Sequence, residues 1–274
     1  AWRDGKMVAH YGGVLREICY FGQTKLAAQI TDVMVSEKER RVLTRRGAFF
    51  LTAATFLESY MGYGAKTWLG FGFPSLRAMK IAQHLGLYAS VGKMVELRFK
   101  TTIAKPHLWT RIRHLQPHKP HKNQFITNQL WQQMQTCLQH ALVGVRDWHY
   151  VQHRYVLHPH HQYELLLITR RFTGQPLGLA VIYRQEDTCH IRDYIEHLRQ
   201  LPEVIKQVQR MAGHWGMRQV RVWITDNFAP VFPLADAEQQ DLEIHIPHNI
   251  WSQSVPPEEI NGHWWLMSGD TDFL

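Results

Sequence analysis

The sequence predicts a mixed α/β (α+β) protein built from two consecutive units that share one order of strands and helices. Of its 274 residues, 45% are hydrophobic and 20% are charged, which is typical of a folded globular protein. Residues 1–104 show the order β-β-β-α-β-α-β, and residues 105–274 repeat it with an additional strand and helix in front. Such repetition indicates two copies of one fold. We therefore expect two tandem domains, each with a central, mostly antiparallel sheet flanked by helices.

The first unit is expected to contain five strands and two helices. Turn signals such as Asp4-Gly5 separate runs rich in Val, Ile, Tyr and Phe, which predict strands. A long apolar run predicts a buried helix, and Ser75 and Gly86 are suitable caps for a second one. The expected strands cover residues 6–11, 14–21, 26–35, 67–73 and 91–99, and the expected helices cover residues 47–60 and 75–85.

A basic, histidine-rich stretch from Lys105 to Lys122 marks the start of the second unit. Helices are expected at residues 124–142 and directly after Pro202, because proline fits the first turn of a helix. The expected strands cover residues 109–115, 163–170, 177–183, 189–195, 220–224, 242–246 and 264–267. No glycine occurs between Gly178 and Gly213, so this unit lacks a flexible loop that could wrap a phosphate group.

The basic residues are unevenly distributed along the chain. The 31 Lys and Arg residues exceed the 23 Asp and Glu residues by eight, and the pI is about 9.5. Residues 1–104 hold 15 basic and 7 acidic side chains, whereas residues 105–274 hold 16 of each. The whole excess of positive charge therefore lies in the first unit, which indicates an anionic partner there.

The sequence predicts neither a membrane span nor a disulfide framework. The longest apolar helix-like stretch, residues 47–57, is about half of the roughly 20 residues that cross a bilayer. Cys19, Cys137 and Cys189 are odd in number and form no CxxC pair. We therefore expect a soluble cytoplasmic protein with no membrane partner, and the sequence leaves its oligomeric state open.

The loop between Val35 and Gly47 is the strongest candidate for an anion-binding site. It follows a strand and leads through the glycine into an apolar helix. The start of a helix offers free backbone N–H groups and the positive end of a dipole, which favour a phosphate or pyrophosphate. The charge would come from Lys38, Arg40, Arg41, Arg45 and Arg46. The alternative is a solvated basic turn in which Gly47 serves only the backbone.

Residues 14–99 resemble the later two-thirds of a GNAT (GCN5-related N-acetyltransferase) domain, which transfers an acyl group from acyl-coenzyme A to an amine. The resemblance rests on the strand-loop-helix of residues 32–51 and on Leu69-Gly-Phe-Gly-Phe-Pro-Ser75. In this family the fourth strand splays from the fifth and holds the pantetheine arm, and the next loop, patterned Arg/Gln-x-x-Gly-x-Gly/Ala, wraps the pyrophosphate. For acetyl-CoA, the resemblance implies contacts from the splayed strand, Val33, Met34 and Val35, and from the loop, Arg40, Arg41, Val42, Leu43, Thr44, Arg45, Arg46 and Gly47.

The sequence departs from the family pattern at positions that bear on catalysis. Thr44 replaces Arg or Gln, and Ala82 replaces a tyrosine that commonly protonates the departing CoA thiolate in this family. Tyr88, beyond the helix end, could protonate the thiolate instead, and Asp32 could accept the amine proton directly or through water. Asp32 could equally cap a strand end, and Tyr88 could be a packing residue.

The resemblance implies N-acetyl transfer by direct attack of an amine on the thioester, without a covalent enzyme intermediate. The acceptor would be an amine of a small molecule or a peptide. A full domain of this family begins with a strand and two helices, and there is no room for them before Lys6. We therefore expect the first domain, residues 1–104, to bind acetyl-CoA but to be incomplete at its front. The second domain, residues 105–274, is expected to be degenerate.

Two other function classes stay open. A non-catalytic CoA-binding or interaction protein would explain the missing tyrosine and the missing front. A nucleic-acid-binding protein would explain the high pI, but it would spread basic residues among aromatic ones along a helix face or groove. Because five basic residues crowd into one loop, a compact polyphosphate is favoured, and we expect no nucleic-acid partner.

The histidines and the acidic end of the chain carry weaker signals. The histidine groups have no zinc-site spacing, so we expect no metal site and interpret them as a polar turn and a basic linker. These groups are His158, His160 and His161, and His107, His114, His118 and His121. The final stretch, Ser268–Leu274, could be a tail or could return toward the basic loop.

Overall fold

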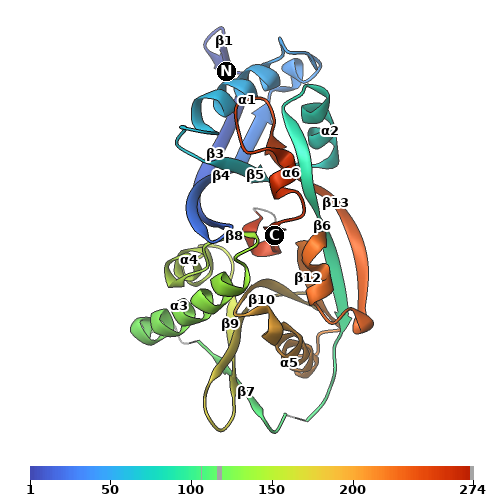
Figure 1. Ribbon diagram of the computed structural model, residues 1–274. Coiled ribbons are helices and arrows are strands. Elements are labelled where there is room, and N and C mark those ends of the chain that lie inside the picture. The colour runs from blue at the N-terminus through green and yellow to red at the C-terminus, as the bar shows by residue number, and fades with distance from the viewer. Residues whose placement is uncertain (106, 116–118, 272–274) are drawn as a thin grey trace.

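The computed structural model describes residues 1–105, 107–115 and 119–271 (Figure 1). Within these residues the chain forms a seven-stranded sheet, a five-stranded sheet and a two-stranded hairpin, with helices packed against them. The predicted mixed α/β architecture is confirmed. His118 in the predicted linker and residues 272–274 lie outside the described residues. No helix in the described part of the chain is long and apolar enough to cross a membrane.

The five-stranded sheet carries the candidate site. In spatial order it consists of β14 (Trp264–Trp265), β8 (Leu142–Gly144), β3 (Ala9–Tyr20), β4 (Gln23–Val35) and β5 (Leu69–Gly72). β3 and β4 form an antiparallel hairpin, and β5 runs parallel to β4. The helices α1 (Ala48–Tyr60) and α2 (Leu76–His84) share one buried cluster with Ala28 of β4. The predicted turn at Asp4-Gly5 joins β1 (Trp2–Arg3) to β2 (Lys6–Met7).

The seven-stranded sheet holds the largest buried cluster. In spatial order it consists of β13 (Ala237–Asn249), β6 (Tyr88–Lys100), β12 (Gln219–Thr225), β11 (Thr188–Ile195), β10 (Pro176–Gln185), β9 (Glu164–Arg170) and β7 (Thr110–His114). Neighbouring strands are antiparallel, except that β11 and β12 are parallel. The helices α3 (Pro120–Cys137) and α5 (Leu201–His214) pack against this sheet. Two short helices, α4 (Trp148–Val151) and α6 (Pro257–Ile260), lie in the connections.

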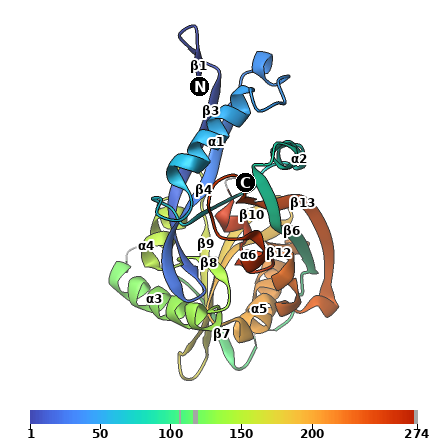
Figure 2. The same ribbon diagram turned by 45° about the horizontal axis from the view of Figure 1, so that its top comes forward.

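The two sheets exchange strands across the predicted boundary between residues 104 and 105. β6 precedes this boundary in the sequence, yet it lies between β12 and β13 in the seven-stranded sheet. β8 and β14 follow the boundary, yet they extend the five-stranded sheet beside β3. Figures 1 and 2 show β6 and β13 running side by side from the level of α2 into the other half of the molecule. Neither of the two larger sheets is therefore built from the residues of one predicted unit alone.

Most predicted elements are present to within a few residues, but two predictions are wrong. β3 does not break at Gly12-Gly13, because both glycines pair with β4, opposite Thr31 and Ile30. The helix predicted to reach Leu142 ends at Cys137, and residues 142–144 form β8 instead. Leu138, Ala141 and Leu142 are fully buried, and a short buried apolar run has no periodicity that separates a strand from a helix.

A buried ion cluster joins the two sheets. Arg146 follows β8, and its Nε donates to Asp193 Oδ1 of β11 at 2.8 Å. Its Nη2 donates to Asp270 Oδ2 at 2.5 Å, in the turn after β14. The hydroxyls of Tyr150 and Tyr155 donate to Asp193 Oδ2 at 3.0 and 2.9 Å. Burial by itself lowers the pKa of Arg146, but the charges of Asp193 and Asp270 raise this pKa well above its ordinary value.

Removing the cation from this cluster should strongly destabilise the protein. Arg146→Leu removes the cation that pairs with Asp193 and leaves Asp270 with only Arg16, at 3.7 Å, so we expect a loss of about 3–5 kcal/mol in the free energy of unfolding, measured by urea denaturation. Arg218→Ala is the matched control, because Arg218 pairs with Asp187 at the surface and its loss should cost less than about 1 kcal/mol. Equal effects of the two substitutions would contradict the assignment of Arg146 as a structural centre.

Candidate functional site

The parallel strands β4 and β5 separate after a short paired stretch. Their pairing runs from Ala27 opposite Leu69 to Ile30 opposite Gly72, and within the described residues no strand pairs with residues 31–35 on the β5 side. β5 ends because Pro74, two residues later, has no N–H to offer a sheet. The chain then turns into α2, where the Ser75 side chain accepts a hydrogen bond from Ala78 N at 3.3 Å. The end of β4 is therefore left with an open edge.

Asp32 lies at a bulge in this open part of β4. Its φ is +51°, and the register with β3 shifts between His10, opposite Met34, and Gly12, opposite Thr31. Aspartate tolerates this left-handed conformation better than most residues. His10 Nδ1 donates to the Asp32 carbonyl oxygen at 2.8 Å, which holds the bulge, and the carboxylate side chain is exposed.

Two cavities lie along the separated strands, and together we call them the groove. The inner cavity has a volume of about 370 Å³, and its lining includes Tyr11, Thr31, Asp32, Val33, Phe49 and Tyr88. The outer cavity also has a volume of about 370 Å³, and its lining includes Val33, Met34, Val35, Arg40, Val42, Leu43 and Arg77. Both cavities share Val33, Phe49 and Ala78, so they lie next to each other along the edge of β4.

Two tyrosine hydroxyls meet at the inner end of the groove. Tyr88, the first residue of β6, is buried, and its hydroxyl contacts the hydroxyl of Tyr11 from β3. Burial raises the pKa of Tyr88 to about 12, although the hydrogen bond with Tyr11 opposes this rise. Burial and the neighbouring Tyr88 raise the pKa of Tyr11 well above its ordinary value. Both hydroxyls therefore keep their protons at neutral pH.

The basic loop closes tightly on the start of α1. Gly47 N donates to Thr44 O at 2.9 Å, and a Cβ at Gly47 would come within 2.1 Å of Val42 O. Glycine is therefore required here by close backbone packing. Among the described residues no side chain caps α1, and Gly47 and Ala48 at its start are buried beneath the loop. Arg40 Nε donates to Val35 O at 2.8 Å and ties the loop to the open end of β4.

The predicted loop residues do not all line the groove. Arg40, Val42 and Leu43 line the outer cavity, together with the three predicted strand residues 33–35. Arg45 stacks on Trp251 instead, with its guanidinium carbon 5.1 Å from the ring centroid. The remaining loop residues line neither cavity, and these are Arg41, Thr44 and Arg46 in the exposed loop and Gly47 at its buried end.

Sequence reasoning missed Tyr11 and Trp251. Tyr11 lies 77 residues before Tyr88, and the indole Nε1–H of Trp251 donates to Glu58 Oε1 at 2.6 Å across 193 residues. No local pattern connects residues so far apart. The hairpin of β3 and β4 could have indicated that Tyr11 lies near Val33, because the register of a hairpin follows from its turn.

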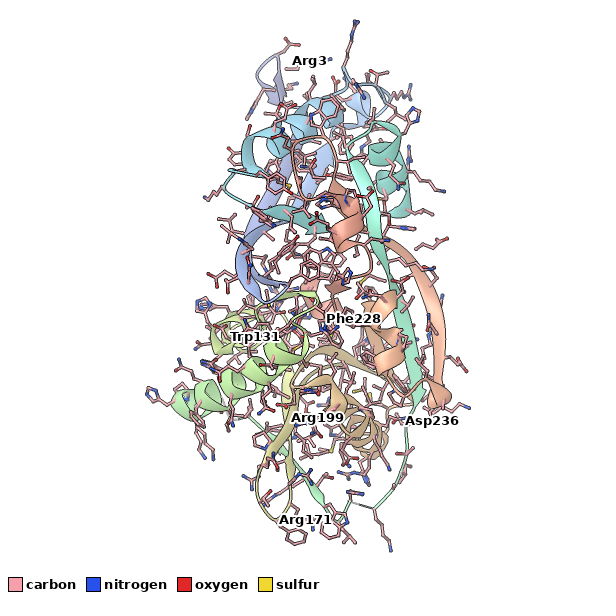
Figure 3. The ribbon with its side chains drawn as sticks, viewed as in Figure 1. Arg3, Trp131, Arg171, Arg199, Phe228 and Asp236 are labelled. Atoms are coloured by element: carbon pink, nitrogen blue, oxygen red, sulfur yellow. The ribbon has the colours of Figure 1, made fainter. Side chains whose placement is uncertain are left out.

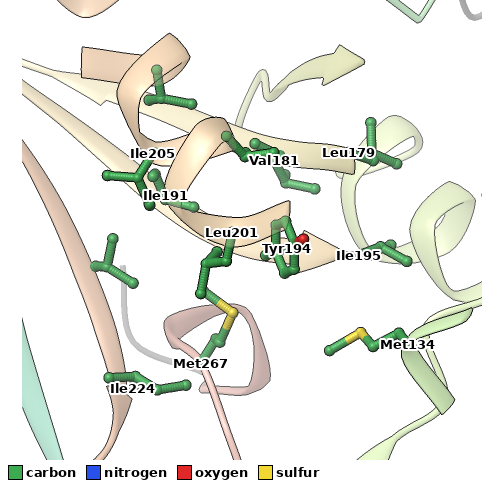
Figure 4. Close-up of a cluster of buried hydrophobic side chains, with 14 of the residues drawn as sticks. Met134, Leu179, Val181, Ile191, Tyr194, Ile195, Leu201, Ile205, Ile224 and Met267 are labelled. Carbon is green, nitrogen blue, oxygen red and sulfur yellow. The ribbon is translucent and has the colours of Figure 1, made fainter. Parts of the chain in front are cut away.

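The seven-stranded sheet has a corresponding pair of parallel strands, but the chain itself fills the space between them. β11 and β12 pair from Thr188 opposite Gln219 to Ile191 opposite Val222. Beyond this point Met267 bridges to Ile224 of β12, and Thr225 N donates to Leu266 O at 3.1 Å. In Figure 4, Met267 lies between Ile224 and the buried side chains of β11 and α5. The sequence left open whether the final stretch is a tail or returns toward the basic loop. Its described part does neither, because residues 266–271 lie between the two sheets.

The histidine group that follows α4 forms a turn. His158 Nδ1 accepts the backbone N–H groups of His160 and His161 at 3.3 and 3.0 Å. Within residues 1–105, 107–115 and 119–271, no three His, Cys, Asp or Glu side chains are placed to share a metal ion.

No protein-family model matches the sequence, and no curated protein matches it significantly. The structure is nevertheless similar to solved structures. A probable N-acyltransferase from Enterococcus faecalis matches with a TM-score of 0.66 and 11% identity, over 91% of this chain and 61% of that one. A GCN5-related N-acetyltransferase from Anabaena variabilis matches with a TM-score of 0.62 and 14% identity, over 92% and 62%. The N-myristoyltransferase of Saccharomyces cerevisiae, solved with myristoyl-CoA and inhibitors, matches with a TM-score of 0.57 and 9% identity, over 90% and 65%.

The chain thus spans less than two thirds of the length of each of these proteins. At such low identities the similarity shows the fold, and it extends over nine tenths of this chain in each comparison. The parallel strands β4 and β5, which separate after a short paired stretch, and the helix α1, which begins after Gly47, agree with this fold. The chain therefore has the fold of the GCN5-related N-acetyltransferases.

Proposed function

We propose that this protein is an N-acyltransferase that moves an acetyl group from acetyl-CoA to an amine. One observation carries the proposal: two adjacent cavities, which share Phe49 in the first turn of α1, extend from Arg40 of the basic loop to Asp32 and Tyr88. The basic loop and the start of α1 are suited to bind phosphates, and Asp32 and Tyr88 are suited to proton transfer. The solved N-myristoyltransferase with bound myristoyl-CoA supports an acyl-CoA donor on this fold.

The proposed donor site uses the groove along its whole length. The pyrophosphate would lie at the first turn of α1, near Arg40, where N–H groups and positive charge coincide. The pantetheine arm would follow residues 33–35, whose backbone is unpaired on the β5 side among the described residues. Val33, Met34 and Leu43 would cover its apolar parts, and these side chains are 45%, 46% and 46% exposed without a ligand.

The proposed reaction is direct acyl transfer. The amine nitrogen attacks the thioester carbonyl carbon, so a C–N bond forms and the C–S bond breaks. Asp32 takes the proton that the amine loses, directly or through water, and Tyr88 donates a proton to the departing thiolate. The raised pKa of Tyr88 suits this role, because it keeps the hydroxyl protonated. The acceptor is an amine of a small molecule or a peptide.

We also propose that each chain binds one acyl-CoA. The space between β11 and β12 is occupied by residues 266–271, and the connection from β11 to α5 contains no glycine. Titration calorimetry with acetyl-CoA should therefore give a stoichiometry of one per chain. A stoichiometry of two would contradict the assignment of a single site.

Charge reversal at the loop tests the donor site. Arg40→Glu removes a cation that lines the outer cavity, so we expect the Kd for acetyl-CoA to rise at least about tenfold in calorimetry. Lys38→Glu is the matched control, because Lys38 lies in the same loop and lines neither cavity. Equal weakening by both variants would indicate only a general charge effect. If the unaltered protein shows no binding at millimolar acetyl-CoA, the proposal fails.

Removal of the Tyr88 hydroxyl tests the chemistry. Tyr88→Phe should lower kcat by about 10²- to 10⁴-fold and leave KM nearly unchanged, measured by thiol release over a panel of amines. Because the pKa of Tyr88 is raised to about 12, this group should not reduce kcat at high pH until the pH approaches that value. Tyr11→Phe is the control, because it removes only the neighbouring hydroxyl. Unchanged kcat in Tyr88→Phe would eliminate its role as an acid.

A non-catalytic CoA-binding protein is the second candidate. The contact of the Tyr88 hydroxyl with Tyr11 favours it, because a hydroxyl engaged in this way must turn before it can donate to a thiolate. Binding of acetyl-CoA with no thiol release over the amine panel would favour this candidate over the enzyme.

A further inference from the structure

The loop between β9 and β10 and the segment before β7 form a projecting tip. Arg171 N donates to Trp109 O at 2.8 Å, and Thr110 of β7 pairs with Arg170 of β9, so the two segments are held together. We define the tip as Leu108, Trp109, Arg111, Arg170, Arg171 and Phe172. It lies at the end of the molecule opposite α1 and α2, where Figure 3 labels Arg171. The groove is therefore far from it.

Large apolar side chains of the tip are directed into solvent. Phe172 is 75% exposed, Leu108 is 72% exposed and Trp109 is 64% exposed. The rings of Trp109 and Phe172 pack against each other edge to face, with their centroids 5.7 Å apart. Apolar side chains that cluster at a projecting loop in this way add little to the core and mark a contact surface.

The charged residues of the tip are all basic. Residues 100–122 and 170–185 contain no Asp or Glu, although residues 105–274 as a whole have as many acidic as basic residues. Arg111, Arg170 and Arg171 are exposed, and no ion pair joins them to any residue that the structure describes. Glu164, on β9, is engaged by Arg184 at 2.6 Å and by His114 at 3.5 Å. The tip therefore favours an anionic partner with an apolar interior.

We propose that the tip docks this protein on an anionic lipid surface. Trp and Phe beside arginines are the combination that enters the headgroup region of a bilayer, where the rings reach the acyl boundary and the cations reach the phosphates. A single-stranded nucleic acid would need exposed ring faces for base stacking. At the tip the edge of one ring covers a face of the other, and the third large apolar side chain, Leu108, is aliphatic, which suits an acyl boundary better than a base. The sequence analysis expected no membrane partner, so this proposal departs from that expectation. It does not depend on the proposed acyl transfer.

Cosedimentation with lipid vesicles tests the docking. The protein should sediment with vesicles of phosphatidylcholine and phosphatidylglycerol in equal parts, and not with phosphatidylcholine alone. Arg170→Glu with Arg171→Glu should lower the partition coefficient at least about twentyfold, because each basic residue near such a surface contributes about fivefold. Trp109→Ser with Phe172→Ser should also abolish sedimentation. The tip side chains are exposed, so these variants should fold, which circular dichroism checks.

Matched controls separate the tip from general effects. Lys66→Glu with Lys80→Glu reverses the same number of exposed cations far from the tip. Phe125→Ser with Leu157→Ser removes two apolar side chains that are 72% and 58% exposed. Both should leave the partition coefficient within about twofold of the unaltered protein. Failure of the unaltered protein to sediment with anionic vesicles, or equal loss in control and tip variants, overturns the proposal. Tighter binding to a single-stranded oligonucleotide than to anionic vesicles through the same residues also overturns it.

Discussion

Arg146 is fully buried between two carboxylates. Because a buried charge is costly unless it is paired, the elements that carry Asp193 and Asp270 must both be in place around it in the folded protein. Asp193 comes from the seven-stranded sheet, and Asp270 comes from the turn beside the five-stranded sheet. In the same turn, the carbonyl oxygen of Asp270 accepts a hydrogen bond from Gln29 Nε2 of β4 at 2.7 Å. The cluster thus positions β4, which carries Asp32, relative to the sheet that contains β6 and Tyr88.

The groove results from backbone constraints more than from charge. Pro74 ends β5 early, the bulge at Asp32 turns the end of β4 away, and Gly47 lets the loop pack against α1. These three features leave an apolar strand edge that the fold does not cover. Val33 is 45% exposed at this edge, and its neighbour across the groove, Val42, is 43% exposed. Contiguous exposed apolar side chains beside a cavity are typical of a ligand site.

Local signals predicted local features well. The cap at Ser75, the turn at Asp4-Gly5 and the glycine before α1 all depend on residues within a few positions of each other, and all are present. The order of strands in space could not be predicted in this way, because β6 and β13 are about 150 residues apart in the sequence. Tyr11 and Trp251 could not be predicted for the same reason, because their partners Tyr88 and Glu58 lie far from them in the sequence. Positive charge in the loop was visible, but which cations face the groove depends on packing, as Arg45 on Trp251 illustrates.

The exchange of strands between the sheets has a consequence for the order of folding. Tyr88 stands opposite Asn249 in the pairing of β6 with β13, so the inner end of the groove is framed by residues that leave the ribosome at very different times. Pairings of such long range are slow, because the loop between the partners must close before any contact stabilises it. The hairpin of β3 and β4 can form early, but its β3 edge stays unpaired until β8 has been made. Until β8 and β13 arrive, the edges of β3 and β6 are therefore exposed to aggregation in the nascent chain.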